Sequence, residues 1–334
     1  MSETGRAESD DERARAGSRH LPLAPLRERG QGRGEAAALD SAPLQSDEPR
    51  LTNDRWRRGF YRFRQSHLSM VGFAIVVALA LIAIAGPLAI PYPQDVEGAV
   101  RSEARFQPPS FAWPFGTNEV GQDVLSLTIA GARISLAIGF IVVLVGASIG
   151  TVVGAIAGYF GRWVDDALMR FTDLVMTLPS LILAMAIAAA LGGGIVNTMF
   201  AISLSWWPGY ARLVRGEVMA HKENLYVQAA RTVGASPLRI VFRHILPNIV
   251  SPLVVKMSLD MGFAILTAAS LGFIGIGVKP PMPEWGAMLS TARGYMPDFW
   301  WTAVFPGLAI FVAVFGFNLL GDGLRDVLDP RAKR

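Results

Sequence analysis

The chain contains no cysteine, four histidines and only 17% charged residues among its 334 residues. The absence of cysteine excludes disulfides, thiol nucleophiles and thiolate metal sites. The shortage of charge accompanies 51% hydrophobic residues and a mean hydropathy of +0.36, which are high values for a soluble domain. Because several apolar runs approach the roughly 20 residues that cross a bilayer, the sequence predicts an integral membrane protein.

The chain also lacks the common motifs of nucleotide hydrolysis and metal binding. A phosphate-binding P-loop requires Gly-Lys followed by Ser or Thr, and no lysine of this chain follows a glycine. No HExxH, EF-hand or Rossmann pattern is present. The sequence therefore predicts no metal site and no cofactor of its own, and the chain does not hydrolyse nucleotide through a P-loop.

The apolar runs predict an all-α fold with six transmembrane helices. A polar stretch over 1–55 has no apolar periodicity, so it is expected to be a disordered tail. Three consecutive glycines, Gly192 to Gly194, separate the third run from the fourth and predict a tight turn. The six expected spans are 69–91, 133–160, 174–192, 195–214, 249–277 and 300–321.

The distribution of charge predicts the orientation of these spans. Arginines precede the first span, acidic residues dominate the loop after it, and basic residues follow the fourth span. Under the positive-inside rule, the N-terminus, the insert at 215–248 and the C-terminal residues 326–334 are cytoplasmic. Basic residues that lie beside spans fit membrane topology, whereas nucleic-acid binding would need a basic soluble face that the sequence does not show.

Four glycines in the second run recur every four residues: Gly146, Gly150, Gly154 and Gly158. They share one helix face, where a second helix can approach closely; a lining of a translocation path is the alternative. The same stretch holds a G-x-S-x-G pattern around Ser148, which resembles the nucleophile elbow of serine hydrolases. That elbow needs a strand-to-helix turn and a partner histidine, and all four histidines fall outside the predicted spans. An intramembrane hydrolase is therefore the remote alternative.

One pair of opposite charges lies inside the fifth expected span. Lys256 and Asp260 are four residues apart and share a helix face, so they can form an ion pair. Charges within a span are costly and usually face protein or water. The pair is either a structural pair between helices or part of a pore lining.

The polar insert from Tyr226 to Asn248 is the most distinctive segment of the chain. Residues 223–233 have helix-forming composition, with Leu225, Ala229 and Thr232 along one face. Gly234 is the expected helix terminator, and Ser236-Pro237 is a strong restart with an N-cap and a proline at the first helical position. Two short helices hinged at Gly234 are predicted.

The insert resembles the EAA loop of binding-protein-dependent ABC importer permeases, which reads E-A-A, three residues, G, about nine residues and I-x-L-P. Gln228 stands where the family usually has glutamate, so the side chain keeps its length and acceptor oxygen but loses the charge. By this resemblance the loop 223–248 forms short helices that dock on an ATPase subunit. The coupling residues that the resemblance implies are Tyr226, Gln228, Ala229, Ala230, Gly234, Ala235, Ser236, Pro237, Leu246 and Pro247.

Three further segments are similar to motifs of the same family. They are Phe115–Ser126 with Gly131–Ser135, Ser270–Gly277 running into Pro280–Gly286, and Leu320–Pro330. Together they resemble the C-type permease subunit of dipeptide and oligopeptide importers, over about 56–331. The implied type I permease fold has a first span and extracytoplasmic loop over 56–130 and a core of five spans over 131–325.

The resemblance also implies the partners. They are a B-type permease subunit in a heterodimer, two ATPases that bind ATP and Mg, an extracytoplasmic solute-binding protein, and the lipid of a bacterial plasma membrane. A stiff loop that includes Pro281, Glu284 and Trp285 is expected either to contact the binding protein or to be a packed cap. The expected cargo is a peptide, with nickel, glutathione or an opine-like solute as alternatives.

Overall fold

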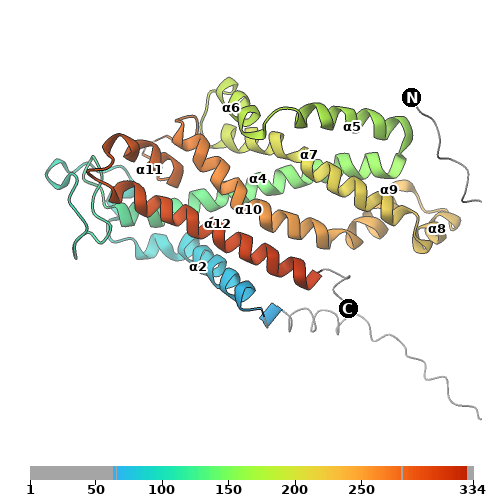
Figure 1. Cartoon of the computed structure of the whole chain (residues 1–334), viewed down its shortest axis with the longest axis horizontal. Helices are drawn as coiled ribbons and strands as arrows, with labels where there is room; N and C mark the ends of the chain where they lie inside the picture. Colours follow the sequence, from blue (N-terminus) through green and yellow to red (C-terminus); the bar gives the residue numbers. More distant parts are fainter. Residues whose placement is uncertain (1–62, 65, 280, 329–334) are drawn as a thin grey trace, which may run out of the picture. The chain divides into compact units, whose positions relative to one another are not determined.

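The computed structural model describes residues 63–64, 66–279 and 281–328, which all belong to one compact unit. The expected tail at 1–55, Pro280 and the last residues 329–334 lie outside the described part. The described residues are helical apart from loops and a single β-bridge between Thr117 and Asp123. The helices (Figure 1) are α2 His67–Ala89, α3 Pro93–Val96, α4 Val124–Phe160, α5 Arg162–Met176, α6 Ser180–Ala190, α7 Ile195–Lys222, α8 Leu225–Thr232, α9 Pro237–Arg239, α10 Val250–Phe273, α11 Trp285–Ala292 and α12 Trp301–Leu328.

Four of the described helices are long and apolar enough to cross a membrane, namely α2, α4, α10 and α12. The bent pair of α5 and α6 makes five if it is counted as one span. Helix α7 is long enough at 28 residues but is less apolar than those four. The all-α membrane fold is thus confirmed, while the count of six spans stays a prediction.

The third expected span, 174–192, is not one continuous helix. Helix α5 ends at Met176 and α6 begins at Ser180, and the two axes differ by 86°. Pro179 lies in this break as the N-cap of α6. A proline disfavours helical conformation in the residue before it and cannot donate a helical hydrogen bond. An apolar run therefore continues through a point where the backbone turns.

The glycine face of α4 packs directly on α7, as the four-residue spacing predicts. A Cβ on Gly150 would lie 2.5 Å from the carbonyl oxygen of Trp207, and one on Gly158 would lie 2.9 Å from that of Arg215. A Cβ on Gly154 would meet the carbonyl oxygen of Ala211. The two backbones are thus in contact over more than two turns, and helix packing is the confirmed role of these glycines.

In the described part of the chain, buried apolar side chains form three clusters around α4. One joins α4 to α6, α7 and α10, and a second joins α4 to α2, α10, α11 and α12. The third lies where α4 and α7 end and the insert begins. We refer to the end that carries the insert 226–248 as the insert end, and to the end that carries 90–123 and 274–300 as the loop end.

Candidate functional site

The insert folds as short helical pieces broken at Gly234. Helix α8 ends at Thr232, and Gly234 follows with φ +78°, a conformation that glycine adopts without strain. The Ser236 hydroxyl accepts a hydrogen bond from Arg239 N at 3.4 Å, and Pro237 is the first residue of α9. Beyond α9 the chain continues as a π-helix over Ile240–Ile245 and a 3₁₀ turn over Leu246–Asn248. The predicted break and restart are present, but the second helix is irregular.

One face of the insert is buried against the ends of α4 and α7. Val227, Ile240 and Ile245 are at most 1% exposed, and they pack with Ala155, Val214 and Val218. Ala230 is also buried, at 8% exposure. The buried face of α8 thus runs through Val227 and Ala230, whereas the sequence pattern singled out Leu225, Ala229 and Thr232, which are exposed.

The other face of the insert carries exposed apolar side chains among polar and basic ones. Val233 is 83% exposed, Leu238 67% and Phe242 62%. Most of the expected coupling residues lie on the surface: Tyr226, Gln228, Ala229, Gly234, Ser236, Pro237 and Pro247, with Ala235 and Leu246 half-buried. Ala230 is the exception, because its methyl group contacts the chain's own core.

Gln228, which replaces the family's glutamate, has a local partner. Its side-chain nitrogen donates to the carbonyl oxygen of Glu223 at 2.9 Å. A carboxylate could not make this bond, because it has no proton to donate. The amide therefore fixes the first turn of α8, and its oxygen remains an acceptor on the surface.

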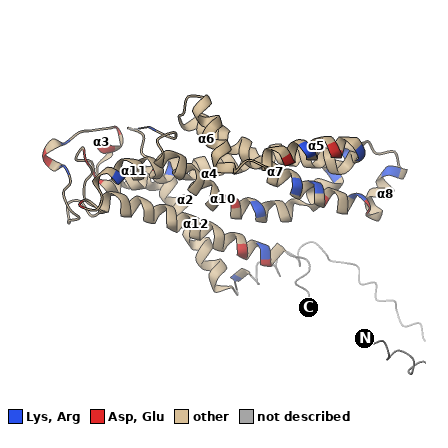
Figure 2. Cartoon of the chain, turned by 45° about the horizontal axis from the view of Figure 1, so that its top comes forward, with Lys and Arg blue, Asp and Glu red and all other residues tan. Residues whose placement is uncertain are grey.

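Basic residues gather around the insert. Figure 2 shows Lys and Arg on α5, α7 and α8, whereas α2 and most of α4 carry none. The Arg231 guanidinium lies 5.5 Å from the ring centre of Tyr159, near the end of α4. Lys222 Nζ donates to the carbonyl oxygen of Gly158 at 3.1 Å. The end of α4 is thus joined to the insert by a cation–π contact and to the end of α7 by a hydrogen bond, as well as by apolar packing.

Glu284 and Trp285, two of the expected binding-protein contacts, are buried at the loop end. Glu284 is 2% exposed and caps α11, accepting from Gly286 N at 2.9 Å, Ala287 N at 2.8 Å and the Ser135 hydroxyl at 3.1 Å. Trp285 is 1% exposed and its Nε1 donates to Thr128 O at 2.9 Å. In this structure both side chains lie in a packed cap, the second of the two expected alternatives. Pro281 is exposed, so a contact of this residue with a binding protein stays a prediction.

Burial raises the pKa of the Glu284 carboxyl above its ordinary value of 4.5, against the lowering effect of its three hydrogen bonds. A folded state with a raised carboxyl pKa binds the proton more tightly than the unfolded state. Glu284 therefore contributes stability at low pH that is lost as pH rises through the folded-state pKa. We expect the melting temperature of the wild type, relative to that of Glu284→Gln, to rise as the pH falls from 7 toward 4.5. A difference that is flat or falls over this range would contradict this expectation.

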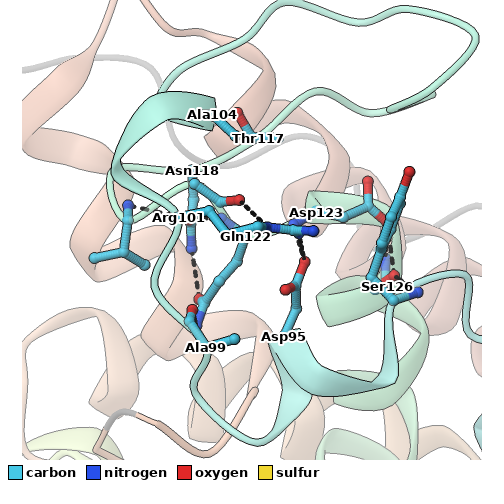
Figure 3. A network of polar contacts seen from close by, with 12 residues as sticks. Asp95, Ala99, Arg101, Ala104, Thr117, Asn118, Gln122, Asp123 and Ser126 are labelled. Carbon is cyan, nitrogen blue, oxygen red and sulfur yellow. Dashed lines mark hydrogen bonds and ion pairs between the residues drawn. The ribbon is translucent and has the colours of Figure 1, made fainter.

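A second polar network at the loop end holds the start of α4 (Figure 3). Asp123 is the N-cap of α4 and accepts from Ser126 N at 2.8 Å and from its hydroxyl at 2.6 Å. The fully buried Asp95 accepts from Asp123 N at 2.7 Å and pairs with Arg101. Burial raises the pKa of Asp95, while the Asp123 N–H and Arg101 lower it. This network gives the Phe115–Ser126 motif a structural role that the sequence did not reveal.

Lys256 and Asp260 form the expected ion pair, with Nζ 3.0 Å from Oδ2. The Lys256 ammonium also lies 4.9 Å from the ring centre of Tyr210, on α7. The side chains are 32% and 16% exposed. The pair thus links α10 to α7, as the structural alternative predicts, and its side chains are not sealed from solvent in the isolated chain.

The geometry around Ser148 gives no support to a hydrolase. The Ser148 hydroxyl donates to Leu144 O at 2.7 Å within the continuous helix α4. No histidine within the described ranges is hydrogen-bonded to it. Among the same residues, no group of three or more His, Asp or Glu side chains is placed to hold a metal ion.

Two family models match the sequence. That of the binding-protein-dependent transport system inner membrane component matches residues 150–334, and that of the N-terminal TM domain of oligopeptide transport permease C matches residues 54–109. The chain therefore belongs to the family of binding-protein-dependent transport system inner membrane components. It is a permease subunit of an ABC importer, a multi-pass transport subunit rather than an enzyme, and the resemblance seen in the sequence is confirmed.

Two relatives illustrate the range of the family. The dipeptide transport system permease protein DppC of Alkalihalophilus pseudofirmus is 42% identical over 278 residues, which cover 83% of this chain and 90% of that protein. The glutathione transport system permease protein GsiD of Pectobacterium atrosepticum is 44% identical over 297 residues, which cover 89% and 97%. An inward-facing structure of the MetNI methionine ABC transporter aligns with a TM-score of 0.49 and 19% identity, over 60% of this chain and 96% of that one.

Proposed function

We propose that this chain is the C-type permease subunit of an importer of dipeptides or oligopeptides, paired with a B-type permease in the plasma membrane of a bacterium. Two ATPases, which bind ATP and Mg, would contact the insert from the cytoplasm, where both termini also lie. A solute-binding protein would deliver cargo at the loop end, where Pro281 is exposed. The dipeptide permease relative supports the peptide cargo, and the glutathione permease relative favours glutathione as the second candidate.

The observation that carries the coupling role is the group of exposed apolar side chains on the insert. Leu238 and Phe242 lie on short helical pieces whose opposite side is buried in the chain's own core. Exposed apolar side chains on a preorganised element bind a partner protein at low entropic cost. Closure of the ATPases would then move the insert together with the ends of α4 and α7.

A charge placed on this face is expected to release the ATPases. In the complete transporter, Leu238→Asp and Phe242→Asp should lower both copurification of the ATPase subunits and peptide uptake more than about tenfold, because burial of an unpaired carboxylate opposes docking. Gly234→Pro should do the same, because proline cannot adopt φ +78°. Leu238→Met and Phe242→Leu keep the two side chains apolar, so they serve as controls for which near-normal uptake is expected.

Full ATPase binding and normal uptake in both Asp variants would refute the coupling role. Ala230→Asp is a less specific test, because Ala230 is buried and the change disturbs the fold of the insert itself. The cargo is tested separately by titrating the associated solute-binding protein with dipeptides, oligopeptides, glutathione and nickel.

A further inference from the structure

Helix α5 is held to α7 by a bidentate ion pair near the insert end. Arg215 Nε lies 2.5 Å from Asp165 Oδ1, and Arg215 Nη2 lies 2.6 Å from Asp165 Oδ2. The side chains are 34% and 12% exposed. A partly buried fork of this kind fixes distance and orientation together, which a single bond from a lysine does not.

Arg215 also lies in the contact between the backbones of α4 and α7. Its carbonyl oxygen faces Gly158, where an added Cβ would stand only 2.9 Å away. On the next turn of α7, Val218 is fully buried against the same end of α4. The residue that binds α5 is therefore packed through its backbone against α4.

The insert packs on this same group of residues. Val227 and Ile240 share a buried cluster with Val214 and Val218, on either side of Arg215. Helix α7 continues to Lys222 and is followed almost at once by α8. A displacement of the insert must therefore move the end of α7, and with it the Arg215 guanidinium.

Helix α5 is connected to the membrane part of the chain on its other side. It runs through the 86° break into the apolar helix α6, which packs in the core with α4, α7 and α10. A firm link at Asp165 would convert movement of α7 into rotation of α5 and α6. A loose link would let α7 slide past α5.

We propose that Asp165 and Arg215 are a positioning pair that carries movement of the insert to α5 and α6, and so couples ATP hydrolysis to transport. The inference rests on the coupling role proposed above for the insert. It adds a second coupling contact, which lies within this chain and outside the insert.

The chain supplies a matched control in the same two helices. Arg212 Nη2 lies 2.5 Å from Asp173 Oδ1, but these side chains are 51% and 55% exposed and form one contact only. Exposed single ion pairs contribute little to the stability of a folded protein. If α5 merely needs electrostatic attachment to α7, both pairs should matter equally.

The test measures peptide uptake and ATP hydrolysis by the complete transporter in proteoliposomes with its solute-binding protein. Asp165→Asn and Arg215→Lys should lower the number of peptides transported per ATP about five- to tenfold, while the ATPase subunits still copurify. Asp173→Asn and Arg212→Lys should keep the ratio within about twofold of the wild type.

An unchanged ratio in Asp165→Asn and Arg215→Lys, or an equal fall in the control pair, overturns the proposal. So does a smaller amount of assembled transporter with a normal ratio, or failure of both variants to assemble, since either result shows a purely structural role. Failure of the insert's coupling role is seen independently, as normal ATPase binding in Leu238→Asp.

Discussion

The Gly150→Ala/Gly154→Ala double variant is expected not to accumulate as an assembled transporter. At both positions an added methyl group meets backbone atoms of α7, which cannot rotate away as a side-chain tip can. Overpacking of this kind costs about 1–3 kcal/mol at one site. Relief of both sites at once requires α4 and α7 to move apart over more than one turn. The single Gly154→Ala variant should melt measurably earlier.

Gly216→Ala is the matched control for these glycines. Gly216 lies on the other helix of the contact, α7, and a Cβ placed on it has nothing within 4 Å. Alanine is favoured over glycine inside a helix by about 0.5–1 kcal/mol, so this variant should be neutral or slightly stabilised. Tryptophan fluorescence can follow the melting, because the chain has eight tryptophans and no cysteine for thiol dyes. Equal melting temperatures for Gly154→Ala and Gly216→Ala would refute close backbone packing.

Replacement of Asp95 by alanine is expected to lower the free energy of unfolding by about 2–4 kcal/mol, because it leaves buried polar groups without partners. The Asp123 N–H loses its acceptor and Arg101 loses its carboxylate. Asp123 itself caps α4, so the first turn of that helix should fray and exchange its amide hydrogens faster.

Glu97→Ala provides the comparison for Asp95. Glu97 lies two residues further along the same loop and is exposed, so its replacement should change stability by less than about 0.5 kcal/mol. Asp95→Asn keeps one acceptor oxygen, so its loss of unfolding free energy should lie between those of Asp95→Ala and Glu97→Ala. If Asp95→Ala and Glu97→Ala have the same free energy of unfolding, the network does not stabilise the start of α4.

The features predicted well from the sequence are those that local chemistry decides. The four-residue spacing of the α4 glycines places them on one face in any helix. The break at Gly234 and the restart at Ser236-Pro237 follow from backbone preferences within a few residues. Membership of the permease family also followed from short contiguous motifs.

The features that the sequence did not reveal depend on residues far apart in the chain. Trp285 looked like a docking residue, yet its indole donates to Thr128 O, 157 positions earlier. Asp95 and Asp123 are 28 positions apart and carry no shared pattern. The buried face of α8 is decided by its contacts with Val214 and Val218. The backbone turn at Pro179 cannot be recognised from hydropathy alone. Tertiary contacts decide each of these.

The length of α4 has a consequence for where partners meet the chain. At about 1.5 Å per residue, its 37 residues extend roughly 55 Å, whereas the hydrocarbon core of a bilayer is about 30 Å thick. Arg133 is the only charged residue of α4, and nine residues precede it toward the loop end. We expect the lipid headgroups to meet α4 near Arg133, so its first turns and the Asp95–Asp123 network stand in water above the membrane. A soluble partner can then dock there without displacing lipid.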